Sequence, residues 1–221
     1  MNGRIDSRAR PAFTLIEVLV VTALITLLMG ILLPTLGRAR IQAKVLAVHA
    51  ELRDIGLALE AYAMDNRGLY PPTRVDCMLG SHFYPLPAEL AESRYLPPPN
   101  PTTFLSAGIE DRFNAGYTYK YRSTGTLIYN RTTVLKEGAS LWVPDGFPHG
   151  DTQDGRLYTS PGRSPVSWVL FSLGPGFDQA EELRLKRLNY PVPKATWFDP
   201  RTKKGVIVRM RLANGTQIGS F

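Results

Sequence analysis

The stretch Ala12-Phe13-Thr14-Leu15-Ile16-Glu17-Val18 places one carboxylate, Glu17, at the entrance of an apolar run without charge from residue 18 to residue 36. A helix rising about 1.5 Å per residue over this run covers nearly all of the ~30 Å hydrocarbon core of a bilayer. A carboxylate inside such a helix costs roughly 2.5–3.5 kcal/mol at its centre and less near the interface. We therefore expect residues 13–36 to form a membrane-spanning or fibre-core half of a helix, with Glu17 paired to another copy of the chain.

The flanks of the apolar run predict its topology. The residues before it include three arginines, and the positive-inside rule keeps that end in the cytoplasm: Arg4, Arg8 and Arg10. No small-residue cleavage site follows the run, so it is not expected to be removed as a secretory signal. Three basic residues just beyond it are placed to meet anionic headgroups or a neighbour's acid: Arg38, Arg40 and Lys44.

Ala12 followed by Phe13-Thr14-Leu15-Ile16-Glu17-Val18-Leu19-Val20-Val21 resembles the processing and methylation signature of type IV prepilins and type II secretion pseudopilins. The resemblance implies that prepilin peptidase cuts between Ala12 and Phe13, that Phe13 becomes N-methylated, and that Glu17 guides assembly. It also implies partners: further copies of the chain, other pseudopilins, an inner-membrane assembly platform, and membrane lipid before assembly. The family usually has glycine before the cut, whereas this chain has Ala12.

The role of Glu17 also has a physical argument. If the amine of Phe13 in one copy lies beside Glu17 of its neighbour, the two charges attract far more strongly in a low-dielectric fibre core than in water. Such a pair fixes the register between neighbouring helices. The alternative is that Glu17 reaches to the membrane interface of an ordinary single-span anchor.

A second, amphipathic helix half is predicted over residues 37–68. Apolar residues recur there at steps of three and four along one face: Ile41, Val45, Val48, Leu52, Ile55, Leu59 and Tyr62. Asn66-Arg67-Gly68 supplies a stop signal. We expect a kink or local melting around Pro34. The apolar face is expected to pack on the chain's own sheet, the alternative being a coiled-coil seam.

Residues 69–221 are predicted to form a globular head. Strand patterns occupy residues 117–122, 126–129, 140–143, 166–173, 205–212 and 216–221. A short helix is expected at 87–93 within an otherwise irregular connection from 71 to 101, and a surface loop at 144–165. The expected fold class is α+β, a pilin-like fold with the long helix packed on a small antiparallel sheet, behind a cytoplasmic leader peptide of residues 1–12.

Segments of the head resemble pseudopilins as well. Residues 58–71 resemble the segment in which a pseudopilin helix ends in a D-N-G-x-Y-P-like turn, and residues 172–178 resemble an S-x-G-P-D turn. Residues 111–121 partly match a D-P-W-G-x-x-Y-x-Y pattern, and residues 199–209 resemble the closing strand of related prepilin-like proteins. The type II secretion major pseudopilin family is therefore the closest likeness.

A calcium site is a further expectation. Asp145, Asp151 and Asp154 lie in one loop and offer the oxygen ligands that calcium takes, with Asp178 an alternative ligand. The spacing is not that of an EF-hand, and major pseudopilins bind calcium in a head loop. The alternative is a solvated acidic turn.

Other classes of function are not favoured. No P-loop, G-x-S-x-G, H-E-x-x-H or paired-carboxylate motif appears, so we expect no enzyme. The single cysteine, Cys77, excludes an internal disulfide and a thiolate-rich zinc site. The formal charge of +7 is only mildly basic, and sheet packing explains the aromatic and basic residues at 117–122 without nucleic-acid binding.

The sequence thus predicts a structural subunit of a type IV pilus-like or type II secretion pseudopilus filament. It is expected to be a single-pass protein of a bacterial inner membrane, with a cytoplasmic amino terminus and a head that is periplasmic, or extracellular after assembly. Two rivals stay open. One is a surface or DNA-uptake pilin, and the other is a membrane-anchored binding module or enzyme that does not polymerise.

Overall fold

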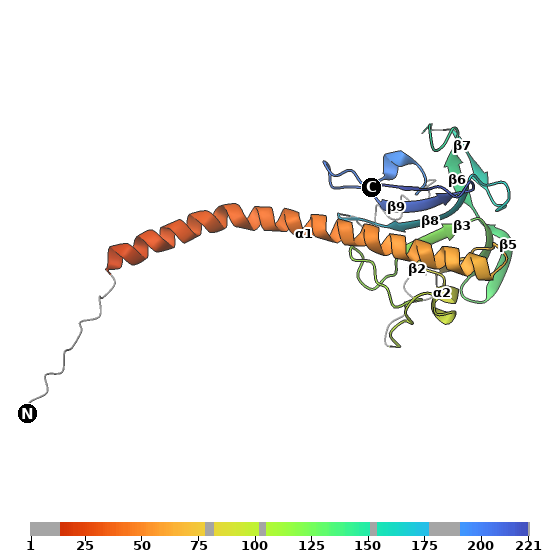
Figure 1. Ribbon diagram of the computed structural model, residues 1–221, viewed down its shortest axis with the longest axis horizontal. Helices are drawn as coiled ribbons and strands as arrows, with labels where there is room; N and C mark the ends of the chain where they lie inside the picture. The colour runs from red at the N-terminus through yellow and green to blue at the C-terminus, as the bar shows by residue number, and fades with distance from the viewer. Residues whose placement is uncertain (1–13, 78–81, 102–104, 151–153, 177–190, 221) are drawn as a thin grey trace, which may run out of the picture. The chain divides into compact units, whose positions relative to one another are not determined.

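The computed structural model describes residues 14–77, 82–101, 105–150, 154–176 and 191–220. Its longest element is the helix α1 (Leu15–Asp65), which accounts for 51 residues (Figure 1). The chain divides into two compact units, residues 1–42 and residues 43–221, so that α1 contributes to both. The helix ends directly before the predicted stop signal Asn66-Arg67-Gly68.

The first half of α1 exposes its apolar side chains to the surroundings. Leu15 is 83% exposed and Leu28 is 65% exposed. A kink or local melting was expected around Pro34, and the helix continues through this residue, so melting does not occur. Proline has no backbone amide hydrogen to donate. The residue that follows it bonds to the helix through its side chain, since Thr35 Oγ1 donates to the carbonyl of Leu32 at 2.8 Å.

The second half of α1 buries one face. The buried side chains follow the predicted spacing: Val45, Val48, Leu52, Ile55 and Leu59. The helix ends in a left-handed turn, where Arg67 has φ 57° and Gly68 has φ 80°. The amide of Gly68 donates to the carbonyl of Ala63 at 2.7 Å, which satisfies an acceptor of the last turn.

One four-stranded sheet has the order β2-β1-β4-β5. Its strands are β1 (Thr73–Asp76), β2 (His82–Phe83), β4 (Gly125–Tyr129) and β5 (Thr133–Ala139). Strand β1 pairs with β4 in parallel, with Thr73 opposite Leu127, while the other pairs are antiparallel. This sheet is therefore mixed, which corrects the expectation of a purely antiparallel head.

A second four-stranded sheet is antiparallel throughout and has the order β10-β9-β8-β3. Its strands are β3 (Lys120–Ser123), β8 (Val166–Ser172), β9 (Ile207–Leu212) and β10 (Gln217–Gly219). Strand β8 is buried at six of its seven residues. Its apolar side chains join those of β9 in the core of the head, which includes Val169, Phe171, Val208 and Met210.

The remaining elements lie in segments predicted to be irregular. Residues 144–165 contain β7 (Gly155–Tyr158), which pairs with β6 (Leu141–Pro144), so this segment is not only a surface loop. Residues 71–101 contain β1, β2 and the short helix α2 (Ala88–Glu92), the last as predicted. A 3-10 turn, η1 (Lys194–Thr196), precedes β9. The predicted α+β class is confirmed.

Candidate functional site

Glu17 lies in the first turn of α1, where it forms a reciprocal cap with Thr14. The amide of Glu17 donates to Thr14 Oγ1 at 3.3 Å, and the amide of Thr14 donates to Glu17 Oε2 at 3.4 Å. This is a capping box, in which the two residues satisfy amide donors that the helix start leaves unpaired. The sequence interpretation missed Thr14 in this role, although the pattern Thr-x-x-Glu was present to indicate it.

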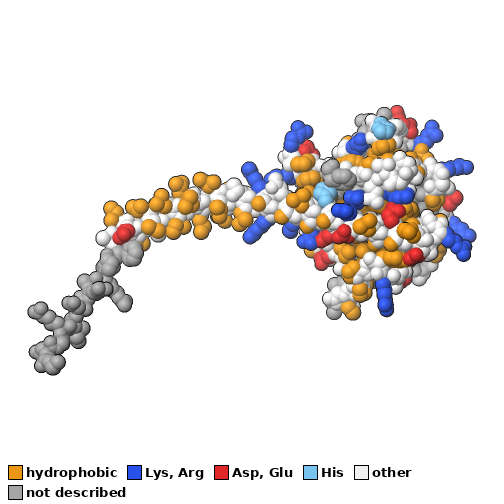
Figure 2. Space-filling view, viewed as in Figure 1, with side chains coloured by type: hydrophobic (Ala, Val, Ile, Leu, Met, Phe, Trp, Pro, Cys, Tyr) orange, Lys and Arg blue, Asp and Glu red, His pale blue; other side chains and the backbone are white. Residues whose placement is uncertain are grey.

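The surroundings of Glu17 are apolar and exposed. Ile16 is 70% exposed and Val18 is 52% exposed, and Figure 2 shows hydrophobic side chains on the visible face of the helix beyond the single acid. By length and composition, α1 contains one segment able to cross a membrane, and none of that segment is buried within the single chain. An exposed apolar surface of this extent marks a place where lipid or other protein is expected to bind.

The two predicted processing residues, Ala12 and Phe13, lie outside the described residues. Cleavage between them and methylation of Phe13 therefore stay predictions. The role of Glu17 in assembly also stays a prediction, although the position of its carboxylate is now known.

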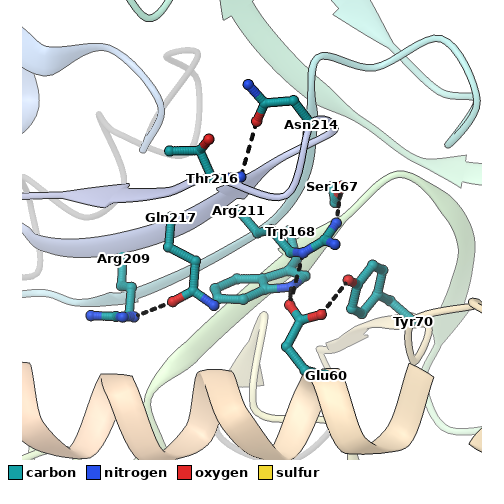
Figure 3. Close-up of polar contacts among 9 residues, drawn as sticks. All are labelled: Glu60, Tyr70, Ser167, Trp168, Arg209, Arg211, Asn214, Thr216 and Gln217. Carbon is teal, nitrogen blue, oxygen red and sulfur yellow. Dashed lines mark hydrogen bonds and ion pairs between the residues drawn. The ribbon is translucent and has the colours of Figure 1, made fainter. Parts of the chain in front are cut away.

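A second polar site joins the end of α1 to the antiparallel sheet (Figure 3). Glu60 Oε1 accepts a hydrogen bond from Trp168 Nε1 at 3.1 Å and lies 3.0 Å from Arg211 Nε. Its other oxygen, Oε2, accepts from the hydroxyl of Tyr70 at 3.0 Å. Burial, and then the bond to Glu60, raise the pKa of Tyr70 to about 12, so this hydroxyl stays a donor at neutral pH. Glu60 thus fixes α1 to strands β8 and β9.

Close packing accompanies this polar site one turn earlier in α1. A Cβ added at Gly56 would lie 3.2 Å from Cη2 of Trp168, so the missing side chain lets the indole lie against the helix. The sequence interpretation did not identify this joint. The available signal was the position of Glu60 between the buried residues Leu59 and Ala63.

Glu51 makes a further polar contact from α1 to the head. Its carboxylate accepts a bond from Nε of Arg112 at 2.8 Å and another from the hydroxyl of Tyr119. Burial, and then the hydrogen bond to Glu51, raise the pKa of Tyr119 well above its usual range. The carboxylates of Glu51 and Glu60 therefore hold the helix to the head at two points.

Asp111 is a buried carboxyl in the loop before β3, with 1% of its surface exposed. Its Oδ1 accepts from the hydroxyl of Ser172 at 2.7 Å and from the amide of Phe113 at 3.0 Å. Burial raises the pKa of Asp111, whereas these bonds and the charge of Lys120 act in the opposite direction. Asp111 fixes the loop to the end of β8.

The four candidate calcium ligands are only partly within the described residues. Asp145 and Asp154 are described, and the amide of Asp145 donates to the carbonyl of Asp154 at 2.9 Å, whereas Asp151 and Asp178 lie outside. A carboxylate oxygen of Asp145 lies 4.0 Å from Arg156 Nε. Over the described ranges, no three His, Cys, Asp or Glu side chains gather as a metal site. Two carboxylates are fewer than the six to eight oxygens that calcium takes, so calcium binding stays a prediction.

Comparison with known protein families gives one finding. Residues 7–33 match the model of the prokaryotic N-terminal methylation motif. No curated protein and no solved structure matches the chain. The match includes Ala12, Phe13, Thr14 and Glu17, and it supports a type IV prepilin-like protein whose motif implies processing by a peptidase and polymerisation.

Proposed function

We propose, from the type IV prepilin-like character that the methylation motif supports, that this chain is a structural subunit of a filament. Prepilin peptidase cuts it between Ala12 and Phe13, and Phe13 is then N-methylated. The subunit enters the filament with Glu17 paired to the new amino terminus of a neighbouring copy. Before assembly, α1 anchors the protein in the inner membrane.

The observation that carries this proposal is the position of Glu17. Its carboxylate is exposed within the matched motif, and the described part of the chain leaves the apolar helix that follows uncovered. A chain that polymerises covers this surface with copies of itself and gives the carboxylate a cationic partner. An ordinary membrane anchor needs the apolar segment but not the acid.

We further propose that the filament is a type II secretion pseudopilus. This finer assignment rests on the likeness of residues 58–71 and 172–178 to major pseudopilins. A surface or DNA-uptake pilus is the alternative within the same class. Deletion of the gene separates them: a pseudopilus subunit is required for protein export, whereas an uptake subunit is required for transformation and gives salt-sensitive binding to DNA.

Mass spectrometry of the purified protein tests processing. In cells with an active prepilin peptidase, the expected mature chain begins at Phe13 and carries one additional methyl group. A chain that retains Met1 under these conditions would contradict the proposal. Without the peptidase, the same cells are expected to give only the uncut form.

Replacement of Glu17 by Ala tests the assembly role. We expect the variant to be inserted and cut but to form no filaments in electron micrographs, because the neighbour's amine loses its partner. Asp54→Ala, which removes an exposed carboxylate from the second half of the same helix, is the matched control. Filaments of undiminished number and length in the Glu17→Ala strain would sink the assembly role.

A further inference from the structure

A groove lies at the carboxyl end of α1, between the helix, β4, β5 and the end of β9. It has a volume of about 720 Å³ and is lined by Glu60, Met64, Leu69, Thr124, Glu137 and Arg211, among others. Two apolar side chains at the groove are strongly exposed, since Met64 is 84% and Leu69 is 64% exposed. Its size lies in the range of sites that bind small ligands or inserted side chains.

Three polar side chains of the groove lack a hydrogen-bond or ion-pair partner among the described residues. The hydroxyl of Thr124 makes no hydrogen bond within the described residues, although this residue is only 6% exposed. Lys136 and Glu137 also line the groove, and neither makes an ion pair with another described residue. The charges of Lys136 and Glu137 are therefore open to a partner of opposite charge.

Backbone strain occurs at the same wall. Glu137 has φ 56°, a left-handed conformation that residues with a side chain rarely adopt. The pairing of β5 with β4 is irregular beside it, because the register shifts between Gly125 and Leu127. The bulge holds Lys136 and Glu137 at the groove, and such strain is often kept where a surface binds a partner.

The lining of the groove is suited to bind an apolar side chain that has a charged residue beside it. Such a feature occurs on the surface of the same protein. Outside α1, the strongly exposed large apolar side chains of the described residues are Leu69, Tyr129, Val134, Leu135 and Leu157. Leu69 belongs to the groove, and the next three lie on the β4–β5 hairpin that forms its wall. Leu157 on β7 is the remaining one, at 61% exposed.

The charge beside Leu157 complements the groove. Arg156 precedes it on β7, its side chain is 77% exposed, and its Nε forms a long ion pair with Asp145 at 4.0 Å. The guanidinium has five N–H donors, so this pair leaves donors that the carboxylate of Glu137 on another copy can accept from. Figure 1 shows the β6–β7 hairpin apart from the carboxyl end of α1, so the hairpin of one copy does not occupy its own groove.

We propose that the groove at the end of α1 binds the β6–β7 hairpin of a second copy of the chain, with Leu157 inserted and Arg156 paired to Glu137. Because groove and hairpin are different surfaces, the contact is heterologous, and repeated application of such a contact builds an open filament. This inference rests on the proposed filament function and adds a contact between heads to it.

Cross-linking of paired cysteines tests the contact in the full-length protein. In a Cys77→Ser background, Leu69→Cys and Leu157→Cys replace two exposed side chains, so both variants are expected to fold. A short bis-maleimide is expected to give covalent dimers and higher multimers in membranes and in filaments. The matched control pairs Leu157→Cys with Leu57→Cys, which is 58% exposed on α1 and outside the groove.

An exchange of charge tests the pairing of Arg156 with Glu137. Glu137→Lys and Arg156→Glu alone are each expected to lower the cross-linked fraction roughly two- to fivefold, which corresponds to an exposed ion pair. The double variant is expected to restore it.

The possible results distinguish this inference from the function on which it rests. Filaments without the Leu69–Leu157 cross-link, or with an equal cross-link in the Leu57 control, overturn the contact and leave the filament function intact. Absence of filaments together with an uncut amino terminus overturns the function itself. Single charge variants that cross-link as well as the parent also contradict the contact.

Discussion

The two halves of α1 belong to one continuous helix, yet their side chains have opposite surroundings. In the first half, Leu28 and its apolar neighbours are exposed, and the first carboxylate, Glu17, bonds to Thr14 at its own helix end. In the second half, Leu52 is fully buried against the head, and Glu60 bonds to two strands of a sheet. Both halves are α-helical, so the difference lies in what covers the side chains.

This difference separates two sources of stability. The second half is stabilised by apolar burial inside the chain, as helices of globular proteins are. The first half depends on surroundings that the single chain does not supply, whether lipid or other copies. Substitutions in the second half are therefore expected to change the free energy of unfolding of the head, and those in the first half to change insertion and assembly instead.

Truncation of a buried leucine gives the largest expected effect on the head. Leu52→Ala is expected to lower the free energy of unfolding by about 2–5 kcal/mol, because it removes apolar contact and leaves a cavity. Leu28→Ala, the same truncation in the first half, is expected to change it by less than about 0.5 kcal/mol. Urea unfolding of the full-length chain in detergent micelles, followed by tryptophan fluorescence, measures both. Equal losses of unfolding free energy in the two variants would contradict the division of α1 into a half that stabilises the head and a half that does not.

Glu60→Gln sharpens the comparison with a polar change. The amide keeps the size of the side chain but loses the charge that faces Arg211 and one of the acceptors used by Trp168 and Tyr70. We expect a loss of about 1–3 kcal/mol in the same unfolding measurement. Asp54→Asn, an exposed acid on the same helix, is the control and is expected to have little effect. If Asp54→Asn lowered the free energy of unfolding as much as Glu60→Gln, the loss would come from the charge of the helix and not from the contacts of Glu60.

The pH dependence of head stability reports on Asp111. Because burial raises the pKa of Asp111 from its usual 3.8, the folded state binds the proton more tightly than the unfolded state. The contribution of this group to stability is complete below about pH 4 and declines as the pH rises through the folded pKa. Asp111→Asn is expected to remove this decline from the urea midpoints measured between about pH 4 and neutrality, while Glu110→Gln preserves it. An unchanged profile in Asp111→Asn would contradict the raised pKa.

The smallest effect is expected at the start of α1. Thr14→Ala removes the hydroxyl that accepts from the amide of Glu17, and an N-cap of this kind contributes about 1 kcal/mol to the local helix. Amide hydrogen exchange at residues 15–18 is expected to become several-fold faster, with no change in the unfolding of the head. Thr22→Ala, whose hydroxyl bonds to the carbonyl of Leu19 inside the helix, serves as control. Exchange that is unaltered at the helix start would show that the cap does not hold it.

The helix and its buried face were predictable because both depend on local spacing. Strands β8 and β9 were also found from their apolar pattern. The missed strands lack such a pattern: six of the seven residues of β5 are exposed, and β1 is fixed by a parallel pairing with β4 about fifty residues away. Glu60 was missed for a related reason, since its partners Trp168 and Arg211 are distant in sequence and an isolated glutamate on a helix indicates solvent.

The joint at Glu60 also sets an order of events during synthesis. Trp168 follows Glu60 by 108 residues, and β9 is made later still. At about 5–20 residues per second, the ribosome takes roughly 5–20 s to deliver Trp168 after Glu60. For that time, Glu60 has neither Trp168 nor Arg211 to bond to, so the second half of α1 cannot yet be fixed to the antiparallel sheet.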